Sequence, residues 1–279
     1  MLLILKNEVK TRLIYILLLI IVLLSISPII WMFLASIKTT AQMFAYPPVI
    51  IPPKPTLNNY RAILFGADSK LPFLINSLII SLITTVIVMA IATPASFSFA
   101  KMKIKGGKNM EFWILSTRMM PPIAVLIPLS LIIRKLALFD TKLGVILVYV
   151  AFNLPYAVWM MTIFFRQLPT EIDEAAMLDG CNWKDIFFKL GIPLILPSFM
   201  TISIFVFIFS WNELLFALIL TGHFSKTMPV AISEFSSGVF IRWELMAAGC
   251  ILQIIPAIFV VIFLQKYIVS GLTMGAVKE

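Results

Sequence analysis

The chain has 279 residues, of which 61% are apolar and only 13% are charged. Soluble domains have about 45–50% apolar and about 25% charged residues, so this composition excludes an ordinary soluble enzyme and also a disordered chain. Two cysteines are too few for a disulfide scaffold. The net charge of +9 is dispersed between long apolar segments, which argues against a nucleic-acid partner and for a membrane protein.

Long apolar segments recur along the chain. About 20 apolar residues cross a bilayer as a helix, and segments of this length are helices rather than barrel strands. The sequence therefore predicts an all-α integral membrane protein with a lipid bilayer as its surroundings. The six predicted transmembrane helices are 13–37, 71–100, 112–133, 143–165, 199–221 and 245–265.

Basic residues set the predicted orientation, because cytoplasmic loops carry an excess of lysine and arginine. The deciding residues lie before the first span and between the second and third: Lys6, Lys10, Arg12, Lys101, Lys103, Lys105 and Lys108. Both termini are thus predicted to be cytoplasmic. Residues 1–70 hold the first helix and a proline-rich external loop, 71–270 form the core transmembrane domain, and 271–279 form a cytoplasmic tail.

The loop 166–198 is predicted to be cytoplasmic and to form two short helices. The first starts at Pro169 and ends at Gly180, which is suited to a left-handed turn. Asn182 can cap the second, over 183–190, which is expected to end at Gly191. Acids dominate the polar positions, and the apolar residues need a surface to cover, so the loop is predicted to dock on another protein. These apolar residues are Ile172, Ala176, Trp183, Ile186 and Phe187.

The same loop carries a motif with long spacing: Glu174-Ala175-Ala176, three residues, Gly180, nine residues, Leu190, one residue and Ile192-Pro193. It resembles the EAA loop of ABC-importer permeases, E-A-A-x3-G-x9-I-x-L-P. It departs from that pattern at two positions, where Leu190 replaces isoleucine and Ile192 replaces leucine. Both replacements keep the apolar character. The segments 117–122, 153–156, 211–214 and 271–278 are similar to sugar-importer permeases of the maltose-importer type.

The resemblance implies a type I ABC-importer permease fold in the cytoplasmic (inner) membrane. It implies four kinds of protein or solute partner: a second permease subunit, two ABC ATPase subunits, an extracytoplasmic solute-binding protein, and a sugar or polyol as cargo moved inward by alternating access. In that family the EAA loop is the coupling helix that contacts the ATPase. The corresponding residues here are Glu174, Ala175, Ala176, Asp179, Gly180, Leu190, Ile192 and Pro193.

The chain has no G-x-x-x-x-G-K-[ST] phosphate loop, so ATP is expected on the partner subunits and no cofactor is expected in this chain. We accordingly expect a transporter subunit rather than an enzyme, with no catalytic residue and no metal site.

Glu213 is the one acid inside a predicted span, and an ionisable group at that depth is a functional-site hypothesis. It either lines a translocation path with Ser210 and Asn212 or ties two helices together. Arg118 either extends to the lipid headgroups or makes a polar contact within the bundle near Pro121.

Two other classes of protein remain as alternatives. An ion-gradient-driven secondary transporter predicts a midplane ion site with several polar groups. A membrane-embedded enzyme predicts clustered acids, histidines or cysteines. The single intramembrane acid and the docking loop favour the permease over both. The sequence leaves open which sugar is carried and whether this subunit touches it.

Overall fold

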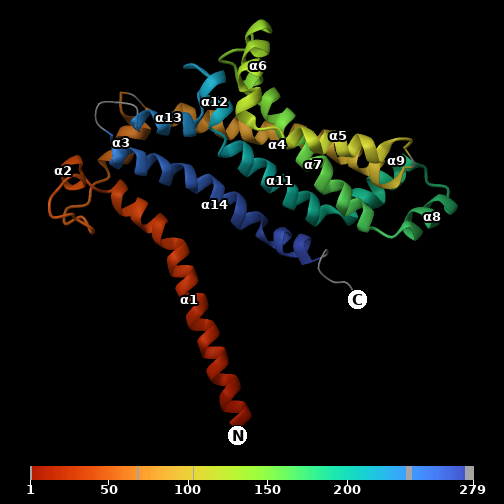
Figure 1. The fold of residues 1–279 in the computed structure, drawn as a ribbon, viewed down its shortest axis with the longest axis horizontal. Coiled ribbons are helices and arrows are strands. Elements are labelled where there is room, and N and C mark those ends of the chain that lie inside the picture. The colour runs from red at the N-terminus through yellow and green to blue at the C-terminus, as the bar shows by residue number, and fades with distance from the viewer. Residues whose placement is uncertain (1, 68, 103, 237–240, 274–279) are drawn as a thin grey trace. The chain divides into compact units, whose positions relative to one another are not determined.

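The computed structural model describes residues 2–67, 69–102, 104–236 and 241–273 (Figure 1). Lys103 and the tail residues 274–279, which entered the predictions above, lie outside these ranges. All regular elements of the described residues are helices, which confirms the all-α prediction. Four of them are long and apolar enough to cross a membrane: α1 (Leu2–Ser36), α4 (Leu71–Lys101), α7 (Lys142–Gln167) and α14 (Trp243–Thr273).

Two bent pairs of helices pass the same test of length and composition together, which gives up to six spans if each pair is one span. α5 (Gly107–Arg118) and α6 (Pro122–Lys135) meet at 92°, and the segment Trp183–Leu194 meets α11 (Leu196–Trp211) at 75°. The predicted span 112–133 is therefore not one straight helix but is broken at the Pro121-Pro122 pair. Pro122 is the first residue of α6, and a proline lacks the N–H that an uninterrupted helix would need. The predicted span 199–221 is also broken, because α11 stops at Trp211 and a separate α12 (Leu215–Leu220) follows.

The remaining elements are short. They are α2 (Thr40–Met43), α3 (Asn58–Phe65), α8 (Thr170–Leu178), α9 (Trp183–Asp185), the π-helix η1 (Ile186–Gly191), α10 (Ile192–Leu194), α13 (Met228–Ser233) and the 3₁₀ helix η2 (Glu234–Ser236).

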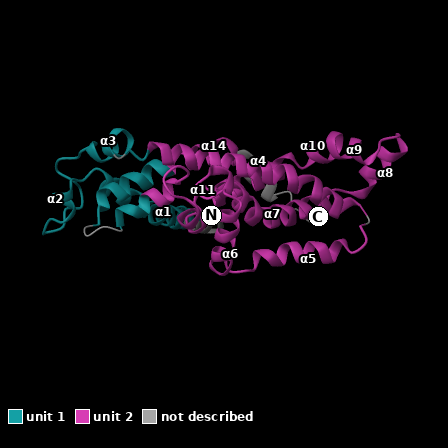
Figure 2. Cartoon of the chain, turned by 90° about the horizontal axis from the view of Figure 1, so that it is seen from above, with its two compact units in different colours: residues 1–70, 232–253 teal, residues 71–231, 254–279 magenta. Residues whose placement is uncertain are grey.

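The chain divides into two compact units (Figure 2). Unit 1 comprises Met1–Lys70 and Ile232–Gln253, and unit 2 comprises Leu71–Ala231 and Ile254–Glu279. In unit 1 the side chains from Thr11 to Trp31 on α1 are all exposed within the chain. Such a continuous apolar surface has to be covered by lipid or by another subunit.

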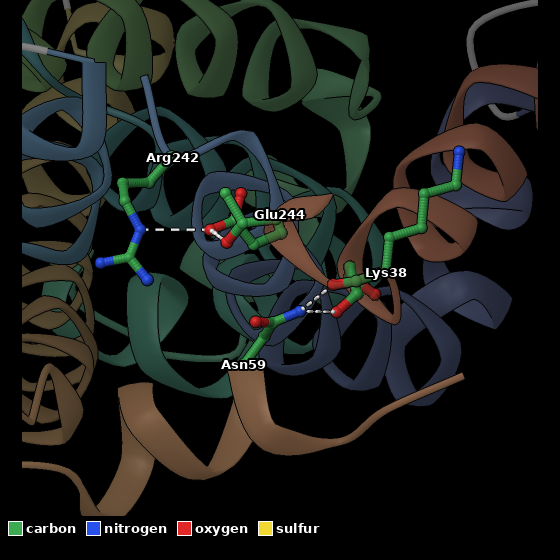
Figure 3. Close-up of polar contacts among 6 residues, drawn as sticks. Lys38, Asn59, Arg242 and Glu244 are labelled. Atoms are coloured by element: carbon green, nitrogen blue, oxygen red, sulfur yellow. Dashed lines mark hydrogen bonds and ion pairs between the residues drawn. The ribbon is translucent and has the colours of Figure 1, made fainter. Parts of the chain in front are cut away.

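Buried polar contacts hold the end of α1 in unit 1 (Figure 3). The Asn59 amide donates hydrogen bonds to the carbonyls of Ser36 and Lys38, each over 2.8 Å. The Glu244 carboxylate is 1% exposed and accepts hydrogen bonds from the Thr40 hydroxyl at 2.9 Å and the Arg242 Nε at 3.1 Å. These bonds join segments that are distant in the sequence.

In unit 2, α4 packs along α7 and α11 covers both. Small and β-branched side chains line this contact, including Ala92, Ala157 and Val206, each 0% exposed. Small residues allow membrane helices to approach closely and to form polar bonds across the interface. One such bond runs from the Ser96 hydroxyl of α4 to the Val158 carbonyl of α7, over 2.9 Å.

The first turns of α4 hold the segment 222–228. We call this segment the Asp140 loop because its N–H groups bind the carboxylate of Asp140, which lies outside it. The Asn76 amide donates to the carbonyls of Phe224 and Lys226 at 2.9 and 3.0 Å. The Ser77 hydroxyl accepts a hydrogen bond from the Met228 N–H at 2.8 Å. The start of α4 is thereby fixed to the chain that follows α12.

Asp140, between α6 and α7, gives this loop its name. Its carboxylate accepts hydrogen bonds from the backbone N–H groups of Gly222, His223, Phe224 and Ser225 over 2.8–3.1 Å, and from the Ser225 hydroxyl at 2.9 Å. Partial burial by itself raises the pKa of Asp140. The hydrogen bonds outweigh that effect and hold its pKa well below the usual range.

Candidate functional site

The motif within 174–193 folds as two short helices joined by a left-handed turn. α8 ends at Leu178, and Gly180 follows two residues later in the left-handed conformation, with a φ of 86°. The Gly180 N–H donates to the Met177 carbonyl at 3.0 Å, and the Cys181 N–H donates to the Ala176 carbonyl at 2.9 Å. These two bonds form a Schellman cap, which favours glycine at its left-handed position. The predicted end of the first helix is confirmed.

The second helix differs from the prediction. Asn182 does cap α9, because its Oδ1 accepts a hydrogen bond from the Asp185 N–H at 3.0 Å. The helix does not end at Gly191, however, since α9 continues through η1 into α10. The Ile192 N–H donates to the Phe187 carbonyl, the wider spacing of a π-helix. The π-helix has one more residue in each hydrogen-bonded turn than an α-helix. This wider turn allows the chain to stay helical past Pro193, which has no N–H to donate.

The EAA motif has a buried face and an exposed face. Ala176 and Ile186 are 7% and 1% exposed and pack in the core of unit 2 rather than forming a docking surface as predicted. The loop does present other apolar side chains, among them Met177, 39% exposed, and Leu178, 90% exposed, at the end of α8. In its second half Trp183, one of the predicted docking residues, is 37% exposed and Phe188 is 57% exposed. Of the other motif residues, the exposed ones are Glu174, Ala175, Asp179, Gly180 and Pro193, and the partly buried ones are Leu190 and Ile192.

An ion pair that the sequence did not reveal ties this loop to α4. Lys101 Nζ lies 2.8 Å from Asp173 Oδ2 and also donates a hydrogen bond to the Leu168 carbonyl at 2.8 Å. The two charged side chains are 3% and 12% exposed. α8 is thus attached to the last residue of α4 by a shielded charge pair.

Aromatic packing provides a second attachment one turn earlier on α4. The Phe97 ring lies 5.3 Å from the Phe165 ring, 5.1 Å from the Phe187 ring and 6.1 Å from the Trp183 ring, measured between centroids. Edge contacts of this kind favour a fixed relative orientation of the rings. α4 therefore contacts both short helices of the EAA loop. In Figure 2, α8 and α9 lie together at one end of unit 2.

A second candidate site is a cavity of about 340 Å³ where α11 gives way to α12, which we call the Glu213 cavity. Asn212 and Glu213 line it from the break itself. Ser210 lies behind the lining, 5% exposed, and its hydroxyl is held by Asn153 Nδ2 at 3.3 Å. The structure thus brings two of the three predicted path residues to one cavity and buries the third beside it.

Glu213 has both of its carboxylate oxygens engaged. Oε1 accepts a hydrogen bond from the Phe216 N–H at 3.0 Å, and Oε2 accepts one from the Ala217 N–H at 3.1 Å. Unpaired N–H groups at a helix start favour a negative charge, so the carboxylate stabilises the beginning of α12. The same residue lines the cavity and fastens α12 to the end of α11.

Arg118 ends α5 at the bend and points into unit 2. Its Nη1 donates to the Phe152 carbonyl at 2.5 Å, and its guanidinium carbon lies 5.9 Å from the Tyr156 ring centroid and 5.4 Å from that of Phe209. Of the two interpretations offered by the sequence, the structure adopts the polar contact within the bundle. Arg118 also lines the Glu213 cavity.

Comparisons with known proteins define the class. Residues 92–274 match the family described as the binding-protein-dependent transport system inner membrane component. SugB, a trehalose transport system permease protein of Mycobacterium tuberculosis, is 39% identical over 254 residues, covering 90% of this chain and 92% of its own. The probable ABC transporter permease protein y4oR of Sinorhizobium fredii is 36% identical over 251 residues, covering 90% of each chain.

A solved structure shares the fold. It is the crystal structure of a bacterial ABC transporter involved in the import of the acidic polysaccharide alginate, which matches with a TM-score of 0.75 and 24% identity. The match covers 94% of this chain and 97% of that one.

The chain belongs to the family of ABC-importer permeases, the inner membrane components of binding-protein-dependent transport systems. The predicted class is thereby confirmed: a multi-pass membrane protein that serves as a transporter subunit rather than as an enzyme. The alternative of an ion-gradient-driven secondary transporter belongs to a different class.

Proposed function

We propose that this chain imports a sugar or a related polyhydroxylated solute, as one of two permease subunits that form the path by alternating access. The similarity to a relative named for trehalose transport supports a sugar cargo. An extracytoplasmic solute-binding protein delivers the cargo, in keeping with the description of the family.

The observation that carries the proposal is the two-faced EAA loop. α8 is fixed to α4 through Asp173 in its first turn, while Met177 and Leu178 stay exposed in its last turn. An exposed apolar pair on a capped, rigid helix has the character of a protein contact. We assign this surface to an ATPase subunit, with Glu174 and Gly180 at its edge.

The ATPase subunits bind and hydrolyse ATP, so this chain holds no cofactor of its own. Because the EAA loop faces the ATPases, it is cytoplasmic, and the two termini lie on the same side. The Asp140 loop, at the opposite end of α4, then faces outward. Closure of the ATPases moves α8, and the attached α4 moves with it.

We assign the translocation path to the surface that includes Asn212 and Glu213, with Ser210 supporting it from behind. Polar groups beside broken membrane helices are typical of transporter substrate sites. The role of Glu213 in this proposal is twofold, since it presents polar atoms to the cavity and fixes the start of α12.

The test begins with the solute-binding protein that co-purifies with the complex. Its thermal stability is measured against trehalose, maltose, glucose and mannitol, because a ligand raises the melting temperature of the state it binds. The complex with its ATPases is then reconstituted in liposomes and assayed for uptake of any sugar that binds. We expect ATP-dependent uptake that requires the binding protein. Uptake without ATP, or no uptake of any sugar or polyol that stabilises the binding protein, would overturn the proposal.

A further inference from the structure

The segment that follows α1 has the opposite polarity to the one that water favours. Residues 39–53 contain no charged side chain. Four large hydrophobic side chains in this segment are between 60% and 96% exposed within the chain: Phe44, Tyr46, Ile50 and Ile51. We call residues 44–53 the apolar loop. A hydrophobic patch of this kind indicates contact with a membrane or with another protein.

The basic residue that precedes the apolar loop, Lys38, is turned inward. It is 4% exposed, and its Nζ donates a hydrogen bond to the Val49 carbonyl at 2.5 Å and lies 5.1 Å from the centre of the Trp31 ring. Burial of a charge is costly unless hydrogen bonds and ring contacts compensate it. The fold therefore hides the charge and leaves hydrophobic side chains outside, which suits surroundings less polar than water.

The apolar loop is held beside the end of α1 (Figure 1). The Thr56 N–H donates to the Ile37 carbonyl at 2.9 Å, and the Tyr60 and Ser36 hydroxyls lie 2.6 Å apart. The candidate span Thr11–Ser36 has 26 residues, which is about 39 Å at a rise of 1.5 Å per residue. A bilayer with its headgroups is about 40–45 Å thick, so the end of α1 and the loop beside it lie near the headgroup level.

The composition of the apolar loop suits the same depth. Half of residues 46–53 are prolines, which have no N–H to leave unsatisfied outside water: Pro47, Pro48, Pro52 and Pro53. Tyrosine, here at position 46, is enriched at the membrane–water interface because its ring is apolar and its hydroxyl is polar. A solute-binding protein docks transiently, and transient interfaces are no more apolar than an ordinary protein surface. These properties favour lipid as the neighbour of the loop.

We propose that the apolar loop inserts into the interfacial region of the outer leaflet. Its four exposed hydrophobic side chains lie among the headgroups and the upper acyl chains, and they anchor the external end of α1. The choice of leaflet follows from the orientation proposed above. The insertion itself rests on the membrane class of the protein and not on its cargo.

The experiment places an environment-sensitive fluorophore on the apolar loop. Tyr46→Cys is labelled with NBD in the complex with its ATPases, in which Cys181, Cys250 and the cysteines of the partner subunits are replaced by serine. The complex is reconstituted in phosphatidylcholine nanodiscs. Quenching is measured with a lipid spin-labelled just below its headgroup, with a lipid spin-labelled at the end of its acyl chain, and with iodide in the water. Lys54→Cys, an exposed position just beyond the loop, is the matched control.

We expect the shallow spin label to quench position 46 more strongly than the deep one does. Iodide should quench position 46 several-fold less than position 54. The double change Ile50→Asp with Ile51→Asp should abolish the lipid quenching at position 46, because carboxylates are costly to remove from water. Ile50→Val with Ile51→Val should keep it. The ATPase content of each purified complex shows that the variants assemble.

Four results would overturn the inference. Strong quenching by iodide and none by lipid would show that the loop faces water. No quenching by lipid or by iodide would show that the second permease or another subunit covers the loop. Iodide quenching that disappears only when the solute-binding protein is added would assign the loop to that partner. Lipid quenching that the aspartate pair leaves unchanged would show that the hydrophobic side chains do not hold the loop in the bilayer. None of these results depends on which solute the complex imports, so they are separate from the uptake assay.

Discussion

Lys101, the last residue of α4, and Asp173, in the first turn of α8, form an ion pair with 2.8 Å between Nζ and Oδ2. The pair is shielded from water, with side chains 3% and 12% exposed. Removing one partner of a buried pair leaves the other charge unpaired, whereas replacing both partners by apolar groups is often neutral. The pair therefore links the EAA loop to α4. Replacing either charged residue alone is expected to destabilise this contact.

Lys101→Met should destabilise the complex by about 3 kcal/mol, the cost of leaving Asp173 buried and unpaired. It should also lower the amount of sugar transported per ATP hydrolysed. The double variant Lys101→Met with Asp173→Leu should regain most of the thermal stability without regaining the coupling. Lys105→Met, an exposed lysine of the same connection, is the control. Normal transport per ATP in the single variant would contradict a role for this pair in coupling.

Gly180→Leu should leave the protein in the membrane and uncouple transport from ATP hydrolysis. A Cβ at position 180 meets nothing within 4 Å inside the chain, so the clash is expected with the ATPase and not within the turn. The left-handed φ adds about 1–2 kcal/mol for a residue with a side chain, and less for asparagine. Gly180→Asn should therefore be milder.

Gly106 provides a matched control for that experiment. Its φ is 79°, and a Cβ there also meets nothing within 4 Å, so Gly106→Leu carries the same backbone cost outside the EAA loop. We expect Gly106→Leu to lower stability and keep the transport per ATP. Equal uncoupling by the two leucine variants would trace the effect to general destabilisation and remove Gly180 from the ATPase contact.

Glu213→Ala should slow transport while the complex still assembles with its ATPases. It removes both acceptors at the start of α12, a loss of about 1–2 kcal/mol by analogy with helix caps. Glu213→Gln keeps one acceptor oxygen and should be intermediate. The checks are the uptake rate and the ATPase content of the purified complex. Loss of assembly with a normal uptake rate per assembled complex would leave Glu213 with a structural role alone.

Asp140→Ala should destabilise unit 2 by about 3 kcal/mol at neutral pH, because it removes a charged group that accepts several hydrogen bonds. Asp140→Asn keeps one acceptor oxygen and should cost less. The pKa of Asp140 is lower in the folded protein than in the unfolded chain, where it is about 3.9. The stabilisation is therefore fully present above about pH 4 and is lost as the pH falls toward the folded value.

Thermal unfolding measured as a function of pH checks this prediction. The difference in melting temperature between the wild type and Asp140→Asn should be constant near neutral pH and shrink below about pH 4. A difference that grows on acidification would have the wrong sign for a carboxylate with a lowered pKa and would contradict the assignment.

Local features of the structure follow closely from the sequence. The long apolar segments, the left-handed end of α8 at Gly180 and the cap of α9 by Asn182 all depend on residues a few positions apart. Hydropathy and capping preferences act over such short distances, so the sequence states them directly. The EAA spacing likewise identifies the family without any knowledge of the packing.

Other features depended on groups that only folding brings together. Ala176 and Ile186 lie on the buried face of the EAA loop because α4 and α7 supply the core there, and hydropathy does not say which apolar residues face inward. The breaks in two spans likewise depend on neighbouring helices, which satisfy backbone groups that a broken helix frees.

The sequence by itself determined that this is a membrane permease, which segments are apolar enough to span and where the EAA motif lies. The tertiary structure decided that Lys101 pairs with Asp173, and that Arg118 and Asn153 meet Glu213 at one cavity. The physical reason is the range of the interactions involved. Helix formation and capping are set by near neighbours, whereas ion pairs and cavities arise from packing between segments distant in the chain.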